Sequence, residues 1–171
     1  MTPLSVFSEA DRDFMNLALA EARLALETGD VPVGALVVSA GQVVGRGHNG
    51  REARGDPLAH AEMIALAQAA RTLGRWRLSD CTLYVTLEPC PMCAGAILQC
   101  RLGHLVFGAS DSRAGCCGTL YDLLADGRFP VRVACRRGLM AQEAAGLLSG
   151  FFRSRRRARK AEKGPEPPFC P

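Results

Sequence analysis

The sequence predicts an α/β domain in which a five-stranded mixed sheet carries helices on its faces. Helical and strand-like apolar patterns alternate along the chain in the order α-β-β-α-β-α-β-α-β-α. Residues 81–108 read as strand, helix and strand, a crossover unit that favours parallel pairing. With 171 residues, 48% of them hydrophobic and 22% charged, the chain has the size and composition of one globular domain.

The N-terminal half is predicted to hold a helix, a hairpin and a second helix. Ser8-Glu9-Ala10-Asp11 reads as a capping box that opens the first helix. Two runs of β-formers meet at Ala40-Gly41, which is typical of a hairpin. An alanine-rich helix is expected to begin near His60. The expected elements are helix 9–27, strands 33–39 and 42–48, loop 49–58 and helix 59–73.

The C-terminal half is predicted to complete the sheet. The expected elements are strand 81–87, helix 90–100, strand 104–108, loop 109–118, a short helix 119–125, strand 131–136 and a long helix 141–160. Residues 164–171 contain four prolines and are expected to be disordered. We therefore predict one domain over residues 1–160, ending in a basic helix, and a Pro-rich tail over residues 161–171.

Composition bears on location and on the state of the thiols. No run of about 18 apolar residues is present, and the N-terminus lacks the features of a signal peptide. We expect a cytoplasmic protein that has no membrane partner. Eight cysteines without an export signal, in a chain long enough to bury a core, favour free or metal-bound thiols over a disulfide scaffold.

The net charge of +4 is unevenly distributed. The C-terminal segment 153–163 holds seven Lys and Arg residues and one Glu, so the remainder of the chain is slightly acidic. Such a basic appendage suits a polyanionic partner such as nucleic acid. A solvated, frayed helix would show the same composition, and charge alone leaves both interpretations open.

The segment Cys90-Pro91-Met92-Cys93 is predicted to place two thiols at the start of a helix. Pro91 suits the first helical position, which makes Cys90 the cap residue and puts Cys93 one turn on. The positive end of a helix favours the thiolate that a metal requires. A structural zinc would need two further ligands in a paired motif, and the sequence has none. Three protein ligands and a water molecule are the pattern of a catalytic zinc site.

His60-Ala61-Glu62 is the candidate for completing this site. Two residues turn an ideal helix by about 200°, so His60 and Glu62 can reach a common point only in the first turn. A zinc ion held by His60, Cys90 and Cys93 would then have Glu62 beside its water as a proton shuttle. The alternatives are a thioredoxin-type redox pair and a surface histidine. The two helix starts together favour the catalytic zinc.

The His-x-Glu and Pro-Cys-x-x-Cys pair resembles the signature of zinc-dependent nucleobase deaminases. Further segments resemble bacterial tRNA adenosine deaminases, and the match spans roughly residues 9–160. These segments are Asp30–Ala35, His48-Asn49, Asp56–Glu62, Leu83–Cys90, Phe107–Asp111 and Leu147–Arg153. The resemblance implies a cytidine deaminase-like three-layer α/β/α fold. It also implies hydrolytic deamination of adenosine to inosine at the wobble position of tRNA, with the arginine tRNA bearing an ACG anticodon as the expected substrate.

The resemblance also implies roles for individual residues. Glu62 would shuttle protons, and the substrate would be bound by Asn49, Val33, Ala61, Glu88 and Asp111. The RNA backbone would contact Arg153, Arg155, Arg156, Arg157, Arg159 and Lys160. The implied partners are one zinc per subunit, the tRNA anticodon stem-loop and a second copy of the chain. Phe129-Pro130 and Cys116-Cys117 depart from the family's pattern and indicate altered loop packing.

Two rival functions remain open. One is a deaminase of free bases or mononucleotides (guanine, cytosine or deoxycytidylate) on the same fold, which would have no need of a basic C-terminal helix. The other is a zinc-stabilised RNA-binding module without catalysis, for which the Glu62 carboxylate beside an open coordination position would be superfluous.

Overall fold

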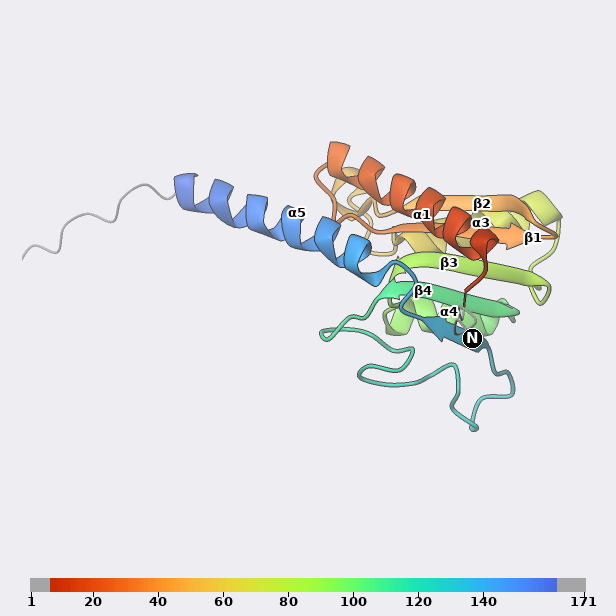
Figure 1. Ribbon diagram of the computed structural model, residues 1–171. Helices are drawn as coiled ribbons and strands as arrows, with labels where there is room; N and C mark the ends of the chain where they lie inside the picture. Colours follow the sequence, from red (N-terminus) through yellow and green to blue (C-terminus); the bar gives the residue numbers. More distant parts are fainter. Residues whose placement is uncertain (1–6, 163–171) are drawn as a thin grey trace, which may run out of the picture.

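The computed structural model describes residues 7–162 and contains one five-stranded mixed sheet in the order β2-β1-β3-β4-β5 (Figure 1). The strands are β1 (Gly34–Ser39), β2 (Gln42–His48), β3 (Cys81–Leu87), β4 (His104–Ala109) and β5 (Ala134–Arg137). The helices are α1 (Glu9–Glu27), α2 (Arg51–Arg54), α3 (Ala61–Leu73), α4 (Pro91–Gln99) and α5 (Ala141–Glu162). The predicted fold class is confirmed.

Strand direction brings four chain segments to one edge of the sheet. Strand β1 runs antiparallel to β2 and β3, whereas β3, β4 and β5 are mutually parallel, as the crossover pattern predicts. Gly34 at the start of β1 pairs with His48 at the end of β2, and neighbouring Ala35 pairs with Val85 near the end of β3. The start of β1 therefore lies between the ends of β2 and β3, at the same edge of the sheet as the end of β4.

Helices cover both faces of the sheet. Helices α1 and α5 lie on the face seen in front in Figure 1, and α3 and α4 lie behind it. Alternate strand residues pack toward each layer, as the pleat requires. The residues on the α1 face are Leu36, Val38, Tyr84 and Val106. Those on the α3 and α4 face are Ala35, Val37, Leu83, Val85, Leu105 and Phe107. The C-terminal half of α5 projects beyond the sheet.

Helix α3 approaches strand β2 closely because Gly47 has no side chain. A Cβ atom at Gly47 would lie 2.4 Å from the carbonyl oxygen of Ala61. Any other residue here would push the first turn of α3 away from the strand. The start of α3 is thereby held against the end of β2.

Three local predictions are wrong. Residues 119–125, predicted as a short helix, form turns with an isolated bridge between Cys117 and Asp122. Their amides have other acceptors, because the Leu123 amide bonds the Cys116 carbonyl and the Thr119 amide bonds the Glu88 carboxylate. The predicted strand 131–136 is displaced to β5, since pairing with β4 begins only where His104 meets Ala134.

The third error is helix α2, which lies inside the loop predicted over residues 49–58. Its first amides are capped by Asp30, whose carboxylate accepts hydrogen bonds from the amides of Glu52 at 2.8 Å and Ala53 at 3.1 Å. The capping residue lies far back in the chain, so no local pattern marks this helix.

The remaining boundaries agree within one or two residues, which is the usual uncertainty of helix ends. The terminal helix continues to Glu162, so most of the predicted Pro-rich tail lies outside the described residues. The described cysteines are all free thiols. Within residues 7–162, none of the helices is both long enough and apolar enough for a membrane span.

Asp11 ties the first helix to the far side of the sheet. As predicted, it completes a capping box with Ser8. Its carboxylate also accepts two hydrogen bonds of 2.8 Å from Arg136 on β5 and one of 2.7 Å from the Tyr84 hydroxyl on β3. The Arg136 guanidinium, more than any other contact, holds the pKa of Asp11 well below its usual range.

We predict that Asp11→Asn lowers the free energy of unfolding by about 2 kcal/mol at pH 7. A carboxylate whose folded pKa is depressed stabilises the protein above its unfolded pKa, near 3.9, and this contribution is lost as the pH falls through the folded value. Urea denaturation at pH 7 and pH 3 should therefore show the difference between variant and wild type shrinking at pH 3. Asp13→Asn, on the exposed side of α1, is the matched control. Equal effects of the two substitutions would contradict the prediction.

Candidate active site

Three metal-ligating side chains meet where two helices begin. His60 is the N-cap residue of α3, and Cys90 is the N-cap of α4, with Pro91 at its first position and Cys93 one turn on. Neither N-cap side chain bonds its own helix backbone, which leaves both free to turn toward a common point. The ligand atoms of His60, Cys90 and Cys93 all lie within 4.8 Å of one another.

The spacing of these atoms fits a tetrahedral zinc site. His60 Nδ1 lies 3.7 Å from Cys90 Sγ and 3.6 Å from Cys93 Sγ. Zinc bonds of about 2.3 Å to sulfur and about 2.05 Å to nitrogen require a separation of roughly 3.6 Å along a tetrahedral edge. Two thiols and an imidazole are also the donor set that zinc prefers. Both nitrogen-to-sulfur distances therefore fit a zinc site in which Nδ1 of His60 would be the liganding nitrogen.

The environment also favours the ionised form of one thiol. A hydrogen bond from Cys93 lowers the pKa of Cys90 to about 4. The same bond, together with burial, raises the pKa of Cys93. The hydrogen bond to Cys90 also raises the pKa of His60.

Glu62 lies beside the three candidate metal ligands but is not one of them. It is in the first turn of α3, the part of the helix in which its side chain and that of His60 can reach a common point. Its side chain is only 4% exposed, and this burial raises its pKa to about 7. A carboxyl group with a pKa near neutrality can both accept and release a proton at physiological pH.

These residues open onto one cavity of about 200 Å³ at the edge of the sheet. Its lining consists of Val31, Val33, Asn49, Arg51, His60, Glu62, Leu87, Glu88, Cys90, Asp111 and Ala114. All the residues predicted to bind substrate line it except Ala61, which is fully buried. Cys93 is fully buried. The structure thus brings the predicted metal ligands and substrate residues together.

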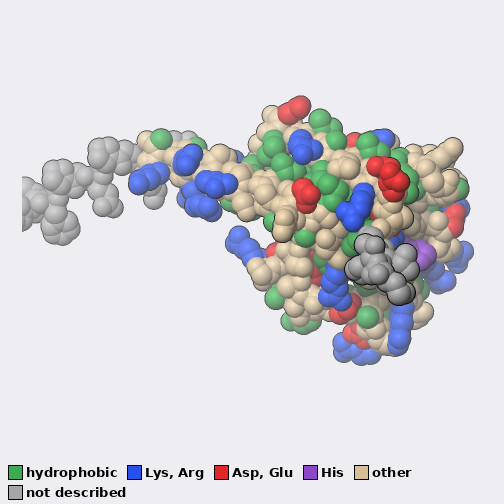
Figure 2. Space-filling view, viewed as in Figure 1, with side chains coloured by type: hydrophobic (Ala, Val, Ile, Leu, Met, Phe, Trp, Pro, Cys, Tyr) green, Lys and Arg blue, Asp and Glu red, His purple; other side chains and the backbone are tan. Residues whose placement is uncertain are grey.

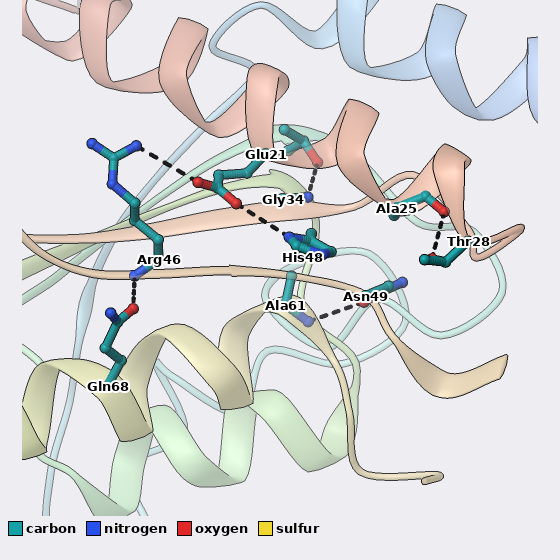
Figure 3. A network of polar contacts seen from close by, with 10 residues as sticks. Glu21, Ala25, Thr28, Gly34, Arg46, His48, Asn49, Ala61 and Gln68 are labelled. Atoms are coloured by element: carbon teal, nitrogen blue, oxygen red, sulfur yellow. Dashed lines mark hydrogen bonds and ion pairs between the residues drawn. The ribbon is translucent and has the colours of Figure 1, made fainter. Parts of the chain in front are cut away.

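Asn49, which follows β2 and lines the cavity, forms hydrogen bonds to the start of α3 and to the backbone before β1. Its side-chain oxygen accepts a hydrogen bond of 3.0 Å from the Ala61 amide at the start of α3 (Figure 3). Its backbone amide donates a hydrogen bond to the Val33 carbonyl. Next to it, His48 Nδ1 lies 3.2 Å from Glu21 on α1, which anchors the end of β2. Within the described part of the chain the Asn49 NH₂ group has no acceptor, so it is available to a ligand in the cavity.

Glu88 has a role that the sequence did not indicate. Its carboxylate, 2% exposed, accepts hydrogen bonds of 3.0 Å from the amides of Asp111, Cys117 and Thr119, and a further one from the Thr119 hydroxyl. A Cβ atom at Gly115 would lie 2.4 Å from this carboxylate, so glycine is required there. Glu88 therefore organises the loop that forms one wall of the cavity.

Arg51 is a cavity residue that sequence reasoning missed. It follows Asn49 closely in the chain, but only helix α2 and its cap by Asp30 turn the segment so that Arg51 lines the cavity. In the sequence, the only indication that Arg51 lines the site is its position two residues after Asn49, a predicted substrate-binding residue.

The cations predicted to contact RNA lie elsewhere. All of Arg153, Arg155, Arg156, Arg157, Arg159 and Lys160 are exposed on α5, and none lines the cavity. Figure 2 shows Lys and Arg side chains gathered along this projecting helix.

Comparison with known proteins agrees with this geometry. The family model described as MafB19-like deaminase matches residues 9–156. A tRNA-specific adenosine deaminase of Bacillus subtilis is 46% identical over 90% of this chain and 95% of its own length. A structure from studies of A-to-I editing by tRNA:A34 deaminases is 39% identical with a TM-score of 0.77, covering 80% of this chain and 99% of that one. A guanine deaminase of Bacillus subtilis is 35% identical with a TM-score of 0.56, over 61% of this chain and 66% of its own.

We predict that Cys93→Ser sharply reduces the zinc that co-purifies with the protein, since loss of a thiolate leaves two protein ligands. Elemental analysis should find about one zinc per wild-type chain. Cys135→Ser, which changes a half-buried thiol on β5, serves as the control and should keep its zinc. Full zinc content in the Cys93 variant would exclude this site.

We predict that Glu62→Gln stabilises the metal-free protein at alkaline pH. Because the folded pKa of Glu62 is raised to about 7, the wild type loses stability as the pH rises from its unfolded pKa, near 4.5, to about 7. The variant should be more stable by about 3 kcal/mol at pH 8 and equal to wild type near pH 4. Denaturation of the metal-free proteins across this range measures the difference. Glu27→Gln, at an exposed site on α1, should show none.

Proposed function

This chain belongs to the family of tRNA-specific adenosine deaminases, and we propose that it hydrolyses adenosine to inosine at the wobble position of tRNA. The observation that carries the proposal is the shared cavity, which is lined by His60 and Cys90 of the three candidate zinc ligands, by the buried Glu62 carboxyl group and by Asn49 with its unpaired side-chain NH₂ group. At about 200 Å³ it is smaller than the pockets of drug-sized ligands, which are about 300–1,000 Å³, and so suits a single base.

The residues divide the chemistry among themselves. Zinc, when bound, lowers the pKa of water and so supplies a nucleophile at neutral pH. Glu62 would take a proton from the attacking water and deliver it to ring N1, and would then take a second proton from the hydroxyl group formed on C6 and deliver it to the departing amine, which leaves as ammonia. The side-chain NH₂ group of Asn49 would donate a hydrogen bond to the nucleotide, and Val33 would pack against the base. Asp111, which also lines the cavity, would contact the ribose.

The substrate must be turned out of the anticodon loop to reach this cavity. Unstacking a base costs a few kcal/mol, which contacts to the rest of the RNA have to offset. We assign this role to the basic residues of α5, since phosphate contacts supply most nonspecific RNA affinity. We propose the anticodon stem-loop of the arginine tRNA with an ACG anticodon as the substrate. An enzyme that acts on this RNA would work in the cytoplasm.

We further propose that the protein acts as a homodimer. Helices α3 and α4 bound an apolar groove of about 440 Å³, and Trp76 at its margin is 54% exposed. An exposed apolar patch of this kind favours association with a second copy, and the RNA would then contact both subunits.

We predict that the zinc-loaded protein converts the adenosine of an ACG-anticodon stem-loop to inosine much faster than it deaminates free adenine, guanine or cytosine. Mass spectrometry of the digested RNA and ammonia release from the bases measure the two rates. Glu62→Gln should retain zinc and lose at least about a hundredfold in rate. Preferred turnover of guanine would instead support the free-base function, in keeping with the similarity to guanine deaminase.

A further inference from the structure

The end of β2 carries two polar side chains that reach different helix layers (Figure 3). His48, the last residue of β2, has its Nδ1 atom 3.2 Å from the Glu21 carboxylate on α1. The next residue, Asn49, accepts a hydrogen bond of 3.0 Å from the Ala61 amide at the start of α3. Successive residues of a strand point to opposite faces of a sheet. The end of β2 is therefore held from both faces.

Helix α1 lies close to this point because Gly34 has no side chain. Gly34, at the start of β1, is the strand partner of His48. A Cβ atom at Gly34 would lie 2.1 Å from the Ala18 carbonyl oxygen and 2.9 Å from the Cβ atom of Glu21. The helix therefore lies directly over the outermost residue pair of the hairpin, which brings Glu21 within reach of His48.

Glu21 is shielded, unlike most acidic residues of its helix. Its side chain is 14% exposed, whereas Glu9, Asp13 and Glu27 are exposed. One carboxylate oxygen contacts His48 and the other lies 3.6 Å from Arg46 Nη1. A carboxylate accepts hydrogen bonds and cannot donate them, so Nδ1–H of His48 is the donor to Glu21.

The position of this contact has more consequence than its strength. A partly solvated pair of this kind adds little to stability. Asn49, however, is the very next residue, and it lines the cavity. A substrate-binding group must be held within about 0.5 Å of its productive position to be effective. A small shift at the end of β2 would therefore affect substrate binding far more than folding.

We propose that Glu21 and His48 are positioning residues, which hold the end of β2 so that the side-chain NH₂ group of Asn49 points into the cavity. Neither residue lines the cavity, so both act through Asn49. The proposal rests on the tRNA-editing function proposed above, in which this NH₂ group binds the nucleotide. It gives α1, which contributes no residue to the cavity lining, a role in the reaction.

The test compares substitutions around one carboxylate. Glu21→Leu removes the acceptor, whereas Glu21→Gln keeps a side-chain oxygen that can accept the hydrogen bond from His48. Arg46→Gln is the matched control, because it removes the other partner of Glu21 and leaves His48 in contact. Each zinc-loaded protein is assayed for steady-state editing of the ACG stem-loop and for stem-loop affinity by fluorescence anisotropy. Zinc content and thermal unfolding are measured on the same samples.

Glu21→Leu should lower kcat/KM at least about tenfold, the effect of losing one well-placed hydrogen bond to the nucleotide. The loss should appear in KM and in stem-loop affinity, with kcat little changed, because the contact binds the nucleotide before the reaction as well as during it. Zinc content should stay at the wild-type level, and Tm should fall by less than about 4 °C. Glu21→Gln and Arg46→Gln should remain within about threefold of wild-type kcat/KM.

A double-mutant cycle tests whether Glu21 acts through Asn49. Asn49→Ala removes the NH₂ group that the contact is proposed to orient. Adding Glu21→Leu to this variant should lower kcat/KM by less than about twofold more. Two residues with independent effects would instead give losses that multiply.

Three results would overturn the positioning role while leaving the editing function intact. They are unchanged kcat/KM in Glu21→Leu, multiplied losses in the cycle, and a loss of activity that is matched by loss of zinc. If Glu21→Leu does not fold, His48→Leu and His48→Asn make the same comparison, since the Asn side-chain NH₂ group takes the place of Nδ1–H. Failure of the wild type to edit the stem-loop would overturn the proposed function. Stem-loop affinity would still decide whether Glu21 acts through Asn49, because it requires no turnover.

Discussion

The antiparallel pairing of β1 with β3, next to the parallel pairing of β3 with β4, determines where the site lies. It places the start of β1 and the end of β2 at the same edge of the sheet as the ends of β3 and β4. Each of those segments then contributes a functional group. Asn49 follows β2, Cys90 follows β3, and Asp111 follows β4. An all-parallel sheet would place the start of β1 at the opposite edge and remove Val33 from the cavity.

Two buried polar side chains convert this arrangement into a rigid cavity. Asn49 bonds the first amide of α3 and the backbone before β1, so it ties the start of the helix that carries Glu62 to the end of the sheet. Glu88 satisfies three amides and a hydroxyl of the following loop. Hydrogen bonds to a charged group contribute about 1.5–3 kcal/mol each, and loss of the acceptor would leave several buried donors unpaired. Rigidity around the cavity preserves the spacing that zinc and substrate need.

Hydrogen bonding and burial account for the electrostatics of the site. The hydrogen bond from Cys93 favours thiolate at Cys90, and the N-termini of α3 and α4, which begin beside the ligand cluster, also suit negative charge. Glu62 experiences the opposite influence, because burial outweighs the neighbouring positive charge and keeps its pKa near neutrality. The pKa of Cys90 is thus lowered while the pKa of Glu62 is raised, and environments that separate the pKa values of two neighbouring acidic groups in this way allow the groups different roles.

Sequence reasoning succeeded where the determining interactions are local. Three features depend only on residues within one helical turn, so the sequence predicted them correctly. They are the capping box at Ser8, the proline at the start of α4 and the helix start at His60-Ala61-Glu62. Sequence reasoning failed where the partner is distant. Helix α2 depends on Asp30, and the irregular segment 119–125 depends on Glu88 and on the carbonyl of Cys116. Arg51 entered the cavity wall only because α2 forms.

The sequence by itself determined the five strands, four of the helices (α1, α3, α4 and α5), the mixed sheet and the candidate metal ligands, since periodicity and short-range spacing indicate them. Only the tertiary structure shows that Glu88, which lines the cavity, also accepts hydrogen bonds from the loop after β4. Only the tertiary structure shows that Arg153 and Arg156 line the same groove as Arg113. These relations join residues 23 to 43 positions apart, and strand pairing and helix packing, which no local pattern records, bring them together.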